Sequence, residues 1–321
     1  MPESLRMSEE CLVTPPPIGA RLSQAALERV LEAHQAWLEG RLDGMRASLG
    51  GIVLAEAALD KVNLERADLK SANFIDARLS GAHLSGATLQ FADFGDATLI
   101  DADLSNTELL DAKLERALLG GANLTEARLM HTSFRGANLR QAHLLEVNME
   151  GCDFVGAILN QARLLQSKVY DCNFTEAELE GTNLYHSTFR CCRLCGIHAE
   201  GSNWSTATLQ NCEFRGADLA TARFDRSDLR QSSFWKATLR GGSFQNARLN
   251  GTDMEAADLT GARFHDATTM SASFCGADLR GAQGLTQTQL ARARTDRRTI
   301  LPDGSHGPYL LGSGAHRPCR L

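Results

Sequence analysis

The sequence has little of what stabilises most globular domains. Aromatic residues make up only 6% of its 321 residues, and proline occurs only 7 times. No stretch approaches the roughly 18 consecutive apolar residues that a membrane-spanning helix needs. The sequence therefore excludes a membrane span, and it favours a thin core of small and aliphatic side chains.

Signals for export and for catalysis are also missing. The segment from residue 1 to residue 20 carries Glu3, Glu9 and Glu10 and has no apolar core of a secretory signal. The sequence contains no HExxH, no GxSxG and no Gly-rich phosphate loop, and its histidines are scattered. We therefore expect a cytoplasmic protein that is not an enzyme and holds no cofactor.

What the sequence does have is an uninterrupted five-residue repeat. From Leu54 to Leu279 every fifth position is a repeat centre, and 42 of the 46 centres are Leu, Phe or Met. The residue two positions before a centre is small in most repeats, usually Ala. A period of five fits neither the helical period of about 3.6 nor the strand period of about 2.0. It predicts short extended stretches joined by corners, with the centre and the small residue pointing inward.

The phenylalanines indicate how many repeats close one coil. Of the 11 centres spaced twenty apart from position 74 to position 274, 8 are Phe, and a second such series holds Phe224, Phe244 and Phe264. A coil of twenty residues stacks ring on ring, which is a favourable internal packing. We therefore predict about 11 four-faced coils whose backbones pair as in a parallel sheet. The register is least regular near Ala199, where Ile197 takes the small position; the exchange nearly conserves volume, so tolerated variation is favoured over the alternative of a local bulge.

The repeats identify a family. Units such as Ala217-Asp218-Leu219 and Ala277-Asp278-Leu279-Arg280-Gly281 resemble those of pentapeptide-repeat proteins. The resemblance covers residues 51–283 and implies an all-β solenoid, the right-handed quadrilateral parallel β-helix. Members of the family include DNA mimics that protect or inhibit gyrase, secreted effectors of bacterial pathogens and developmental regulators. The resemblance therefore implies a fold, and we expect a bacterial protein, but it does not imply one function.

The segments that flank the repeats have the pattern of helical caps. Residues 22–50 are expected to form an amphipathic capping helix with Ser23 as its N-cap, and the apolar positions are Leu22, Leu27, Val30, Leu31, Trp37, Leu38 and Leu42. Residues 284–302 are expected to form a C-terminal helical cap, because Thr286 and Gln289 have capping-box spacing. Residues 1–21 and 303–321 are expected to be flexible. The strand edges of a β-helix need covering, and dimerisation is the alternative role of both helices.

Cysteines occur at both kinds of position. One series of spacing twenty consists of Cys152, Cys172, Cys192 and Cys212 at small inward positions, so we expect inert packing there rather than a metal or disulfide ladder. Cys191 and Cys195 fall on outward positions near His186 and His198. No CxxC pair accompanies them, so we expect exposed thiols and no metal site.

The charge of the repeats bears on DNA mimicry. Residues 51–283 contain 30 Asp and Glu against 22 Lys and Arg, a net charge of −8. Between Arg78 and Lys113 lies an acidic run made of Asp93, Asp96, Asp101, Asp103, Glu108 and Asp111. Basic residues follow it at once, and 7 of them lie from Arg215 to Arg248. We therefore favour a mixed solvated surface over DNA mimicry, and expect no direct nucleic-acid binding by an acidic chain.

Apolar residues at outward positions are the clue to a partner. Leu145, Leu165 and Tyr185 form one column of spacing twenty, and Tyr170 lies in a column on the next face. A contiguous exposed apolar patch marks a protein partner. We therefore predict a non-enzymatic protein-binding module or scaffold built on a β-helical rod. The alternatives are a DNA-mimicking modulator of DNA gyrase and a secreted bacterial effector or accessory component of a secretion system.

Overall fold

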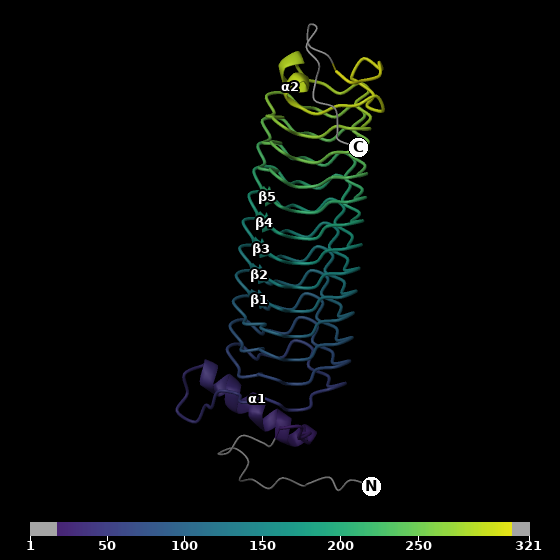
Figure 1. The fold of residues 1–321 in the computed structure, drawn as a ribbon. Helices are drawn as coiled ribbons and strands as arrows, with labels where there is room; N and C mark the ends of the chain where they lie inside the picture. Colours follow the sequence, from purple (N-terminus) through teal and green to yellow (C-terminus); the bar gives the residue numbers. More distant parts are fainter. Residues whose placement is uncertain (1–17, 310–321) are drawn as a thin grey trace, which may run out of the picture. The chain divides into compact units, whose positions relative to one another are not determined.

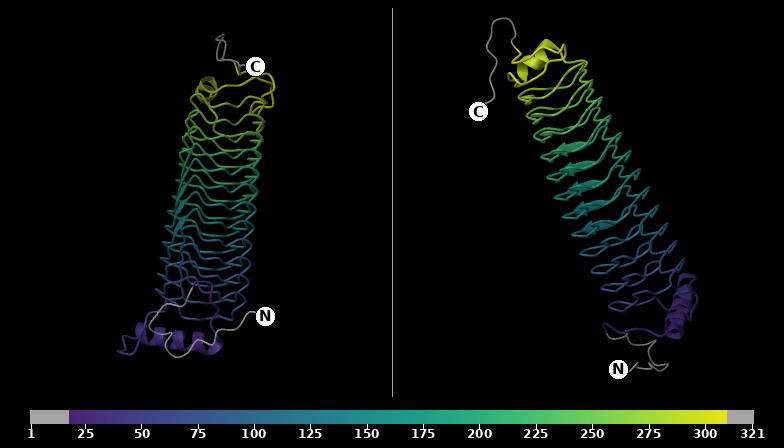
Figure 2. Two further views of the ribbon diagram at one scale, coloured as in Figure 1. Left: turned by 60° about the horizontal axis from the view of Figure 1, so that its bottom comes forward. Right: turned by 90° about the vertical axis from the view of Figure 1, so that its right-hand side faces the viewer.

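The structure, a computed structural model, describes residues 18–309 of a chain that divides into two compact units. Unit 1 is Met1–Asn148 and unit 2 is Met149–Leu321. Within each unit parallel pairing joins residues twenty positions apart, as in Asn73↔Asp93 of unit 1 and Asn173↔Arg193 of unit 2 (Figures 1 and 2). Both units are therefore stacks of twenty-residue coils, and the predicted parallel β-solenoid is confirmed.

Regular elements are few and short. In chain order they are α1 (Gln24–Leu38), β1 (Arg128–Met130), β2 (Asn148–Glu150), β3 (Lys168–Tyr170), β4 (Thr188–Arg190), β5 (Thr208–Gln210) and α2 (Gln287–Arg292). In unit 2 the strands β3, β4 and β5 pair in parallel, with Lys168 opposite Thr188 and Thr188 opposite Thr208. A strand has only 3 residues because a corner follows it at once.

Each coil has four faces of five residues, which we name I to IV in chain order. In the coil from 172 to 191, face I is 172–176, face II is 177–181, face III is 182–186 and face IV is 187–191. The corner after face I shows how a face ends. The Ala177 N–H donates to the Phe174 carbonyl at 2.9 Å, and Glu176 between them has a φ of 59°. A positive φ at the third residue is typical of a type II turn, which redirects the chain into the next face.

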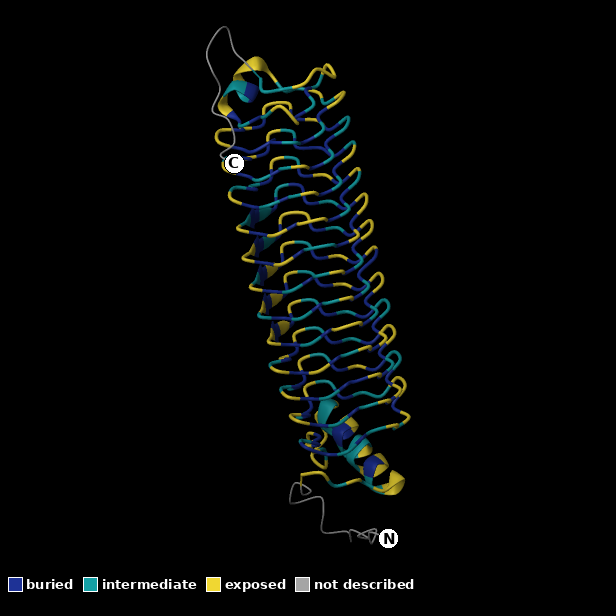
Figure 3. Cartoon of the chain, turned by 45° about the vertical axis from the view of Figure 1, so that its right-hand side comes forward, coloured by how far each residue is buried: buried dark blue, intermediate teal, exposed yellow. Residues whose placement is uncertain are grey.

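The interior of each coil is filled by two side chains from every face. Leu164 and Ala162 of unit 2 are both 0% exposed, and burial alternates in this way along each coil (Figure 3). On face I the rings of Phe74 and Phe94 stack with centroids 4.6 Å apart and planes 2° apart. The predicted inward positions and the predicted ring stacking are confirmed.

The backbone does not bulge near Ala199, in agreement with the favoured interpretation of this irregular coil. The Ala199 N–H donates to the Asp218 carbonyl at 2.7 Å, as in neighbouring coils. Ile197, Ala199 and Trp204 are all 0% exposed, and the Trp204 indole N–H donates to the Ser202 hydroxyl at 2.8 Å. The exchange of a small and a large residue nearly conserves volume, so the core absorbs it without a change of backbone.

Helix α1 packs against the first coil of unit 1, but it is shorter than the segment expected to be helical. Ser23 caps it as predicted, by accepting from the Ala26 N–H at 3.2 Å. It ends because Gly40 takes a φ of 73°, a left-handed conformation typical of a helix C-terminus. The chain then turns back, and a Cβ at Gly44 would overlap the Trp37 backbone nitrogen. Leu42, predicted to be on the apolar side of the helix, is fully exposed in this returning loop.

Helix α2 and the residues after it cover the last coil of unit 2. The predicted capping box is present, with the Thr286 N–H donating to the Gln289 side chain at 2.7 Å and the Gln289 N–H donating to the Thr286 hydroxyl at 3.2 Å. The Gln289 amide also donates to the Ala267 carbonyl at 2.8 Å, and the Thr299 hydroxyl donates to the Phe274 carbonyl at 2.9 Å. These bonds satisfy carbonyls at the edge of the coil, as a cap must.

The expected flexible ends are only partly within the described residues. Residues 1–17 and 310–321 lie outside them. At the N-terminal side the Gly19 N–H donates to the Gly51 carbonyl at 2.7 Å, and Arg21 pairs with Val53. At the C-terminal side the Leu301 N–H donates to the Ser305 carbonyl at 2.8 Å. Residues 19–21 and 305–306 are therefore hydrogen-bonded to neighbouring structure, and the flexibility of the ends stays a prediction.

Candidate functional site

Three of the four residues predicted to bind a partner lie in unit 2, around the strands of face IV. Leu165 and Tyr185 occupy the corner between face III and face IV in successive coils, where the Gln166 N–H donates to the Tyr185 carbonyl at 3.2 Å. Tyr170 ends β3 at the other corner of face IV. Tyr185 is 45% exposed, while Leu165 and Tyr170 are half-buried. We name β3, β4 and β5 with these three residues the face IV surface.

The fourth predicted residue, Leu145, lies in unit 1 and is half-buried at the equivalent corner. We therefore build the site from the residues of unit 2. All four stand one position after a repeat centre, on the second residue of a corner turn, where the side chain does not enter the core. Ser205 and Gln245 hold the same corner position in later coils of unit 2. The fold therefore accepts polar residues there and does not require apolar ones.

Polar groups continue face IV from β5 into the later coils of unit 2. Arg230 donates to both carboxylate oxygens of Asp228, at 2.8 and 2.6 Å, and the Gln210 amide donates to the same carboxylate at 2.9 Å. Burial alone raises the pKa of Asp228, but these donors outweigh burial and hold that pKa below its ordinary value. Gln210, Arg230, Gln231 and Asn250 line an open hollow of about 370 Å³. This part of the surface offers amides and guanidinium groups, with its carboxylate already neutralised.

The predicted cysteine column is buried on face I, at Cys152, Cys172, Cys192 and Cys212. The Cys192 thiol donates to the Val169 carbonyl at 3.5 Å. A hydrogen bond with Cys152, together with burial, raises the pKa of Cys172. The neighbouring Cys192 thiol, together with burial, raises the pKa of Cys212. Nucleophilic attack and metal binding need a thiolate, so the burial of the column and the raised pKa values of Cys172 and Cys212 favour the inert role.

The two outward cysteines are more accessible. Cys191 is exposed and Cys195 is half-buried. Burial raises the pKa of Cys195, and the nearby Glu213 carboxylate, with an oxygen 3.9 Å from its sulfur, acts in the same direction. His186 lies beside Thr206, with ring nitrogen and hydroxyl 3.4 Å apart. Within residues 18–309 no group of three or more His, Cys, Asp and Glu side chains is placed to hold a metal.

The acidic run of unit 1 encircles one coil instead of lining one side. Its members are distributed over all four faces, with Asp93 and Asp96 on face I, Asp101 on face II, Asp103 on face III, and Glu108 and Asp111 on face IV. Lys113 approaches Asp93 at 3.8 Å. Arg116 binds Asp96 with Nε 2.7 Å from Oδ1, and this hydrogen bond lowers the pKa of Asp96. Duplex DNA carries about one negative charge per 1.7 Å of its axis, so a mimic needs a dense array of free carboxylates, and two of these carboxylates are already paired with basic side chains.

Sequence reasoning missed several exposed side chains. In unit 1, Phe91, Ile100 and Leu118 are 48%, 41% and 42% exposed. In unit 2 the ring of Trp235 lies under two cations, Arg215 at 4.3 Å and Lys236 at 4.2 Å from its centroid. The signal was available, because each apolar residue of this kind stands at an outward position of the register.

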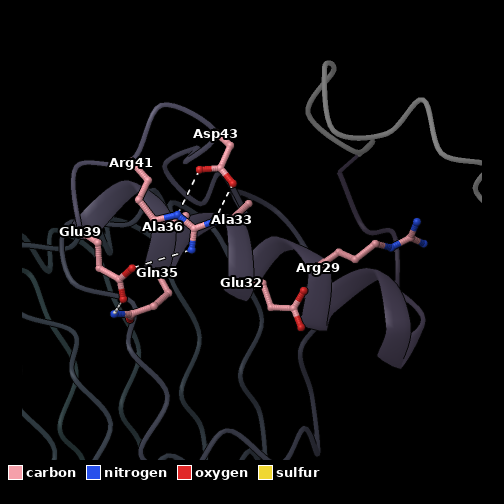
Figure 4. A pocket seen from close by; sticks show the side chains of 8 residues that line it. All are labelled: Arg29, Glu32, Ala33, Gln35, Ala36, Glu39, Arg41 and Asp43. Atoms are coloured by element: carbon pink, nitrogen blue, oxygen red, sulfur yellow. Dashed lines mark hydrogen bonds and ion pairs between the residues drawn. The ribbon is translucent and has the colours of Figure 1, made fainter.

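A second hollow, of about 510 Å³, lies on the outer side of α1 and the loop after it (Figure 4). Arg41 binds Asp43 at 2.7 Å and approaches Glu39 at 3.9 Å, and the Gln35 amide donates to Glu39 at 2.9 Å. These four exposed groups satisfy one another, whereas Arg29 and Glu32, which also line the hollow, form no ion pair with a side chain of the described residues. In the described part of the chain neither helix has the length and hydropathy of a membrane span.

Family models of pentapeptide repeats match the repeat region. The model described as pentapeptide repeats (8 copies) matches residues 47–86, 82–121 and 122–161. The model described as pentapeptide repeat region matches residues 142–219 and 207–294. No curated protein matches the chain.

Solved structures with similarity to this chain include other proteins of the same repeat type. HetL, a pentapeptide repeat protein involved in heterocyst differentiation regulation from the cyanobacterium Nostoc sp. strain PCC 7120, is 22% identical over 89% of this chain and 100% of its own, with a TM-score of 0.25. QnrB1, a plasmid-mediated fluoroquinolone resistance protein, is 18% identical over 55% of this chain and 85% of its own, with a TM-score of 0.25. A pentapeptide repeat protein from the Arabidopsis thaliana thylakoid lumen is 30% identical over 27% of this chain and 68% of its own, with a TM-score of 0.20.

TM-scores this low carry no argument about function. The matches to the two family models, in contrast, run without a gap from residue 47 to residue 294. They cover the region in which bridges join residues twenty positions apart. The chain belongs to the pentapeptide-repeat family.

Proposed function

We propose that this protein is a non-enzymatic protein-binding module, and that the face IV surface is its docking surface in unit 2. The observation that carries the proposal is the exposure of large side chains at corners where the fold accepts polar ones. Tyr185 is 45% exposed, and the half-buried Leu165 and Tyr170 lie in the adjoining coil. Tyrosine combines a large contact area with a low entropic cost, and it is enriched among residues that dominate binding energy.

The interior favours a role without catalysis. Its space is occupied by side chains such as Leu164 and Phe174, both 0% exposed, whereas substrates bind in concave pockets. The hollows at Gln210 and at Arg41 are open, and hydrogen bonds or ion pairs already engage both side chains. Binding on the outer faces is the activity that a stack of coils favours.

DNA-mimicking modulation of gyrase has less support. The acidic residues of unit 1 surround one coil, and two of them, Asp93 and Asp96, are engaged by basic side chains. A gyrase supercoiling assay tests this alternative directly. Inhibition of supercoiling by a wild type that captures no partner other than gyrase would replace our proposal. The roles in secretion, the cytoplasmic location and the absence of direct nucleic-acid binding stay predictions.

Partner capture tests the proposal. The variant Leu165→Ser, Tyr170→Ser, Tyr185→Ser changes only the outer side of the coils, so its circular dichroism should match that of the wild type. The control Val155→Ser changes a half-buried apolar residue on face I. In lysates of the native host, proteins retained by the wild type and the control should be lost from the triple variant. Identical recovery with all three proteins would contradict the assignment of the surface.

A further inference from the structure

The charged side chains of unit 2 are sorted by face. From residue 167 to residue 251, face IV has two anions, Asp171 and Asp228, against four cations, Lys168, Arg190, Arg230 and Arg248. Because Arg230 and Gln210 already satisfy Asp228, the face has an excess of positive charge. Lys168 and Arg190 are exposed on the adjacent strands β3 and β4. Neither forms an ion pair with a side chain of the described residues.

Face II, on the opposite side of each coil, has the opposite charge. From residue 157 to residue 221 it has no Lys or Arg, and its acidic residues are Glu178, Glu180, Glu200 and Asp218. Glu180 and Glu200 are exposed and follow each other in one column, since the Gly181 N–H donates to the Glu200 carbonyl at 2.9 Å. Neither carboxylate has a cationic partner among residues 18–309. Like charges about 4.8 Å apart repel, so the fold gains nothing from this column.

The two charged rows have matching spacing because the same coil sets both. When two stacks lie side by side with parallel axes, their facing strands run in opposite directions. A residue before a repeat centre then faces a residue after one. If Lys168 is opposite Glu200, Arg190 comes opposite Asp218 and Arg230 opposite Asp258. Lys168, Arg190 and Arg230 are one coil and then two coils apart along the chain, and Glu200, Asp218 and Asp258 have the same spacing.

This arrangement has one unfavourable contact and one weaker pair. Arg248 comes opposite Arg280, whose guanidinium is held by its own Asp278 at 2.6 Å. Asp258 already binds Arg240, with Nε 2.5 Å from Oδ2, and Arg230 already binds Asp228, so the pair of Asp258 with Arg230 adds less than the other two. Lys168 with Glu200 and Arg190 with Asp218 are therefore the pairs on which the contact depends.

We propose that face IV of unit 2 binds face II of unit 2 in a second copy of this chain. The inference rests on the proposed function, for which it names the partner. Each copy uses face IV for one neighbour and face II for the other, so the contact is heterologous and builds open rows rather than closed dimers. Its ion pairs lie at the surface, where salt screens charges beyond about 8 Å at physiological ionic strength. Rows therefore form at low salt and dissociate at high salt.

Sedimentation velocity of the full chain at about 20 mM and about 300 mM salt tests the inference. The wild type should be larger than a monomer at low salt and monomeric at high salt. Lys168→Glu and Glu200→Lys each place like charges opposite each other, and each should raise the low-salt dissociation constant roughly tenfold. The double variant Lys168→Glu, Glu200→Lys exchanges the charges and should restore association. Arg163→Glu, an exposed change on face III with the same effect on net charge as Lys168→Glu, should associate like the wild type.

Three results would overturn the inference. They are a wild type that stays monomeric at low salt, a double variant as weak as the single ones, and an equal effect of Arg163→Glu. None of them removes the proposed function, because a different protein captured through Leu165, Tyr170 and Tyr185 would still be lost from the triple serine variant. If that variant loses neither self-association nor any captured protein, the proposed function falls as well.

Discussion

Replacing Leu164 with Ala should destabilise the protein far more than replacing its neighbour Leu165. Leu164 is 0% exposed. Its N–H donates to the Asn183 carbonyl at 2.8 Å, and the Asn183 N–H donates to the Ala162 carbonyl at 3.0 Å. These bonds hold the next coil at a fixed distance, so the cavity left by Leu164→Ala cannot collapse. Leu to Ala in a core costs about 2 to 5 kcal/mol and most where relaxation is least, so we expect about 3 to 5 kcal/mol.

Leu165→Ala is the matched control, because it removes the same atoms from the adjacent corner. Leu165 is half-buried and outside the core, so the loss should be at most about 1 kcal/mol. Urea denaturation followed by circular dichroism measures both losses. If the coils unfold in more than one step, hydrogen exchange at residues 159–184 gives the local free energy of opening. Equal losses, or a larger one for Leu165→Ala, would refute the assignment of inward and outward positions.

Three other predictions concern single side chains. Alkylation of the folded protein should label Cys191 and Cys195, and Cys191→Ser, Cys195→Ser should lose that label; labelling of Cys172 without denaturant would contradict the inert column. Burial lowers the pKa of His34, which faces Arg46 and Glu65. The unfolded state therefore binds more protons than the folded state as the pH falls below about 6.5, and the α1 cap loses stability in acid. Hydrogen exchange of α1 should therefore be faster at about pH 5 than at about pH 7. This difference in exchange rate should be absent in His34→Gln. A wild type without the difference would show that His34 does not control the stability of the cap. Phe91 is 48% exposed with a φ of 60°, so Phe91→Gly should relieve backbone strain and stabilise unit 1 by about 0.5 to 1 kcal/mol; a loss of stability would show that the ring supports the fold.

The interior could be predicted from the sequence because one distance, the coil spacing, decides every inward contact. Phe74 therefore stacks on Phe94, and Cys172 is buried at its small position. The end of α1 could not be predicted in the same way. Leu42 continues the apolar pattern of the helix, but the turn at Gly40 and the packing of Gly44 on α1 place it in solvent. Both effects depend on tertiary contacts that periodicity does not contain.

The outer faces were predicted less well for a geometric reason. Neighbours in the sequence diverge around the coil, while residues twenty apart come together. The acidic run around Asp101 is contiguous in the sequence and therefore distributed over four faces. Glu180 and Glu200 are separated in the sequence and adjacent in space. Which outward column binds a partner does not follow from the register, because the fold accepts many residue types at these positions.

Photo-crosslinking is the most direct test of the claim that the face IV surface binds protein. Benzoylphenylalanine would replace Tyr185, or as a control Thr175, which holds the equivalent corner position after face I. After irradiation in the native host, position 185 should give a crosslinked product, either with a second copy of the chain or with another protein. Position 175 should give none. Crosslinking from position 175 alone, or from both positions to the same extent, would contradict the account.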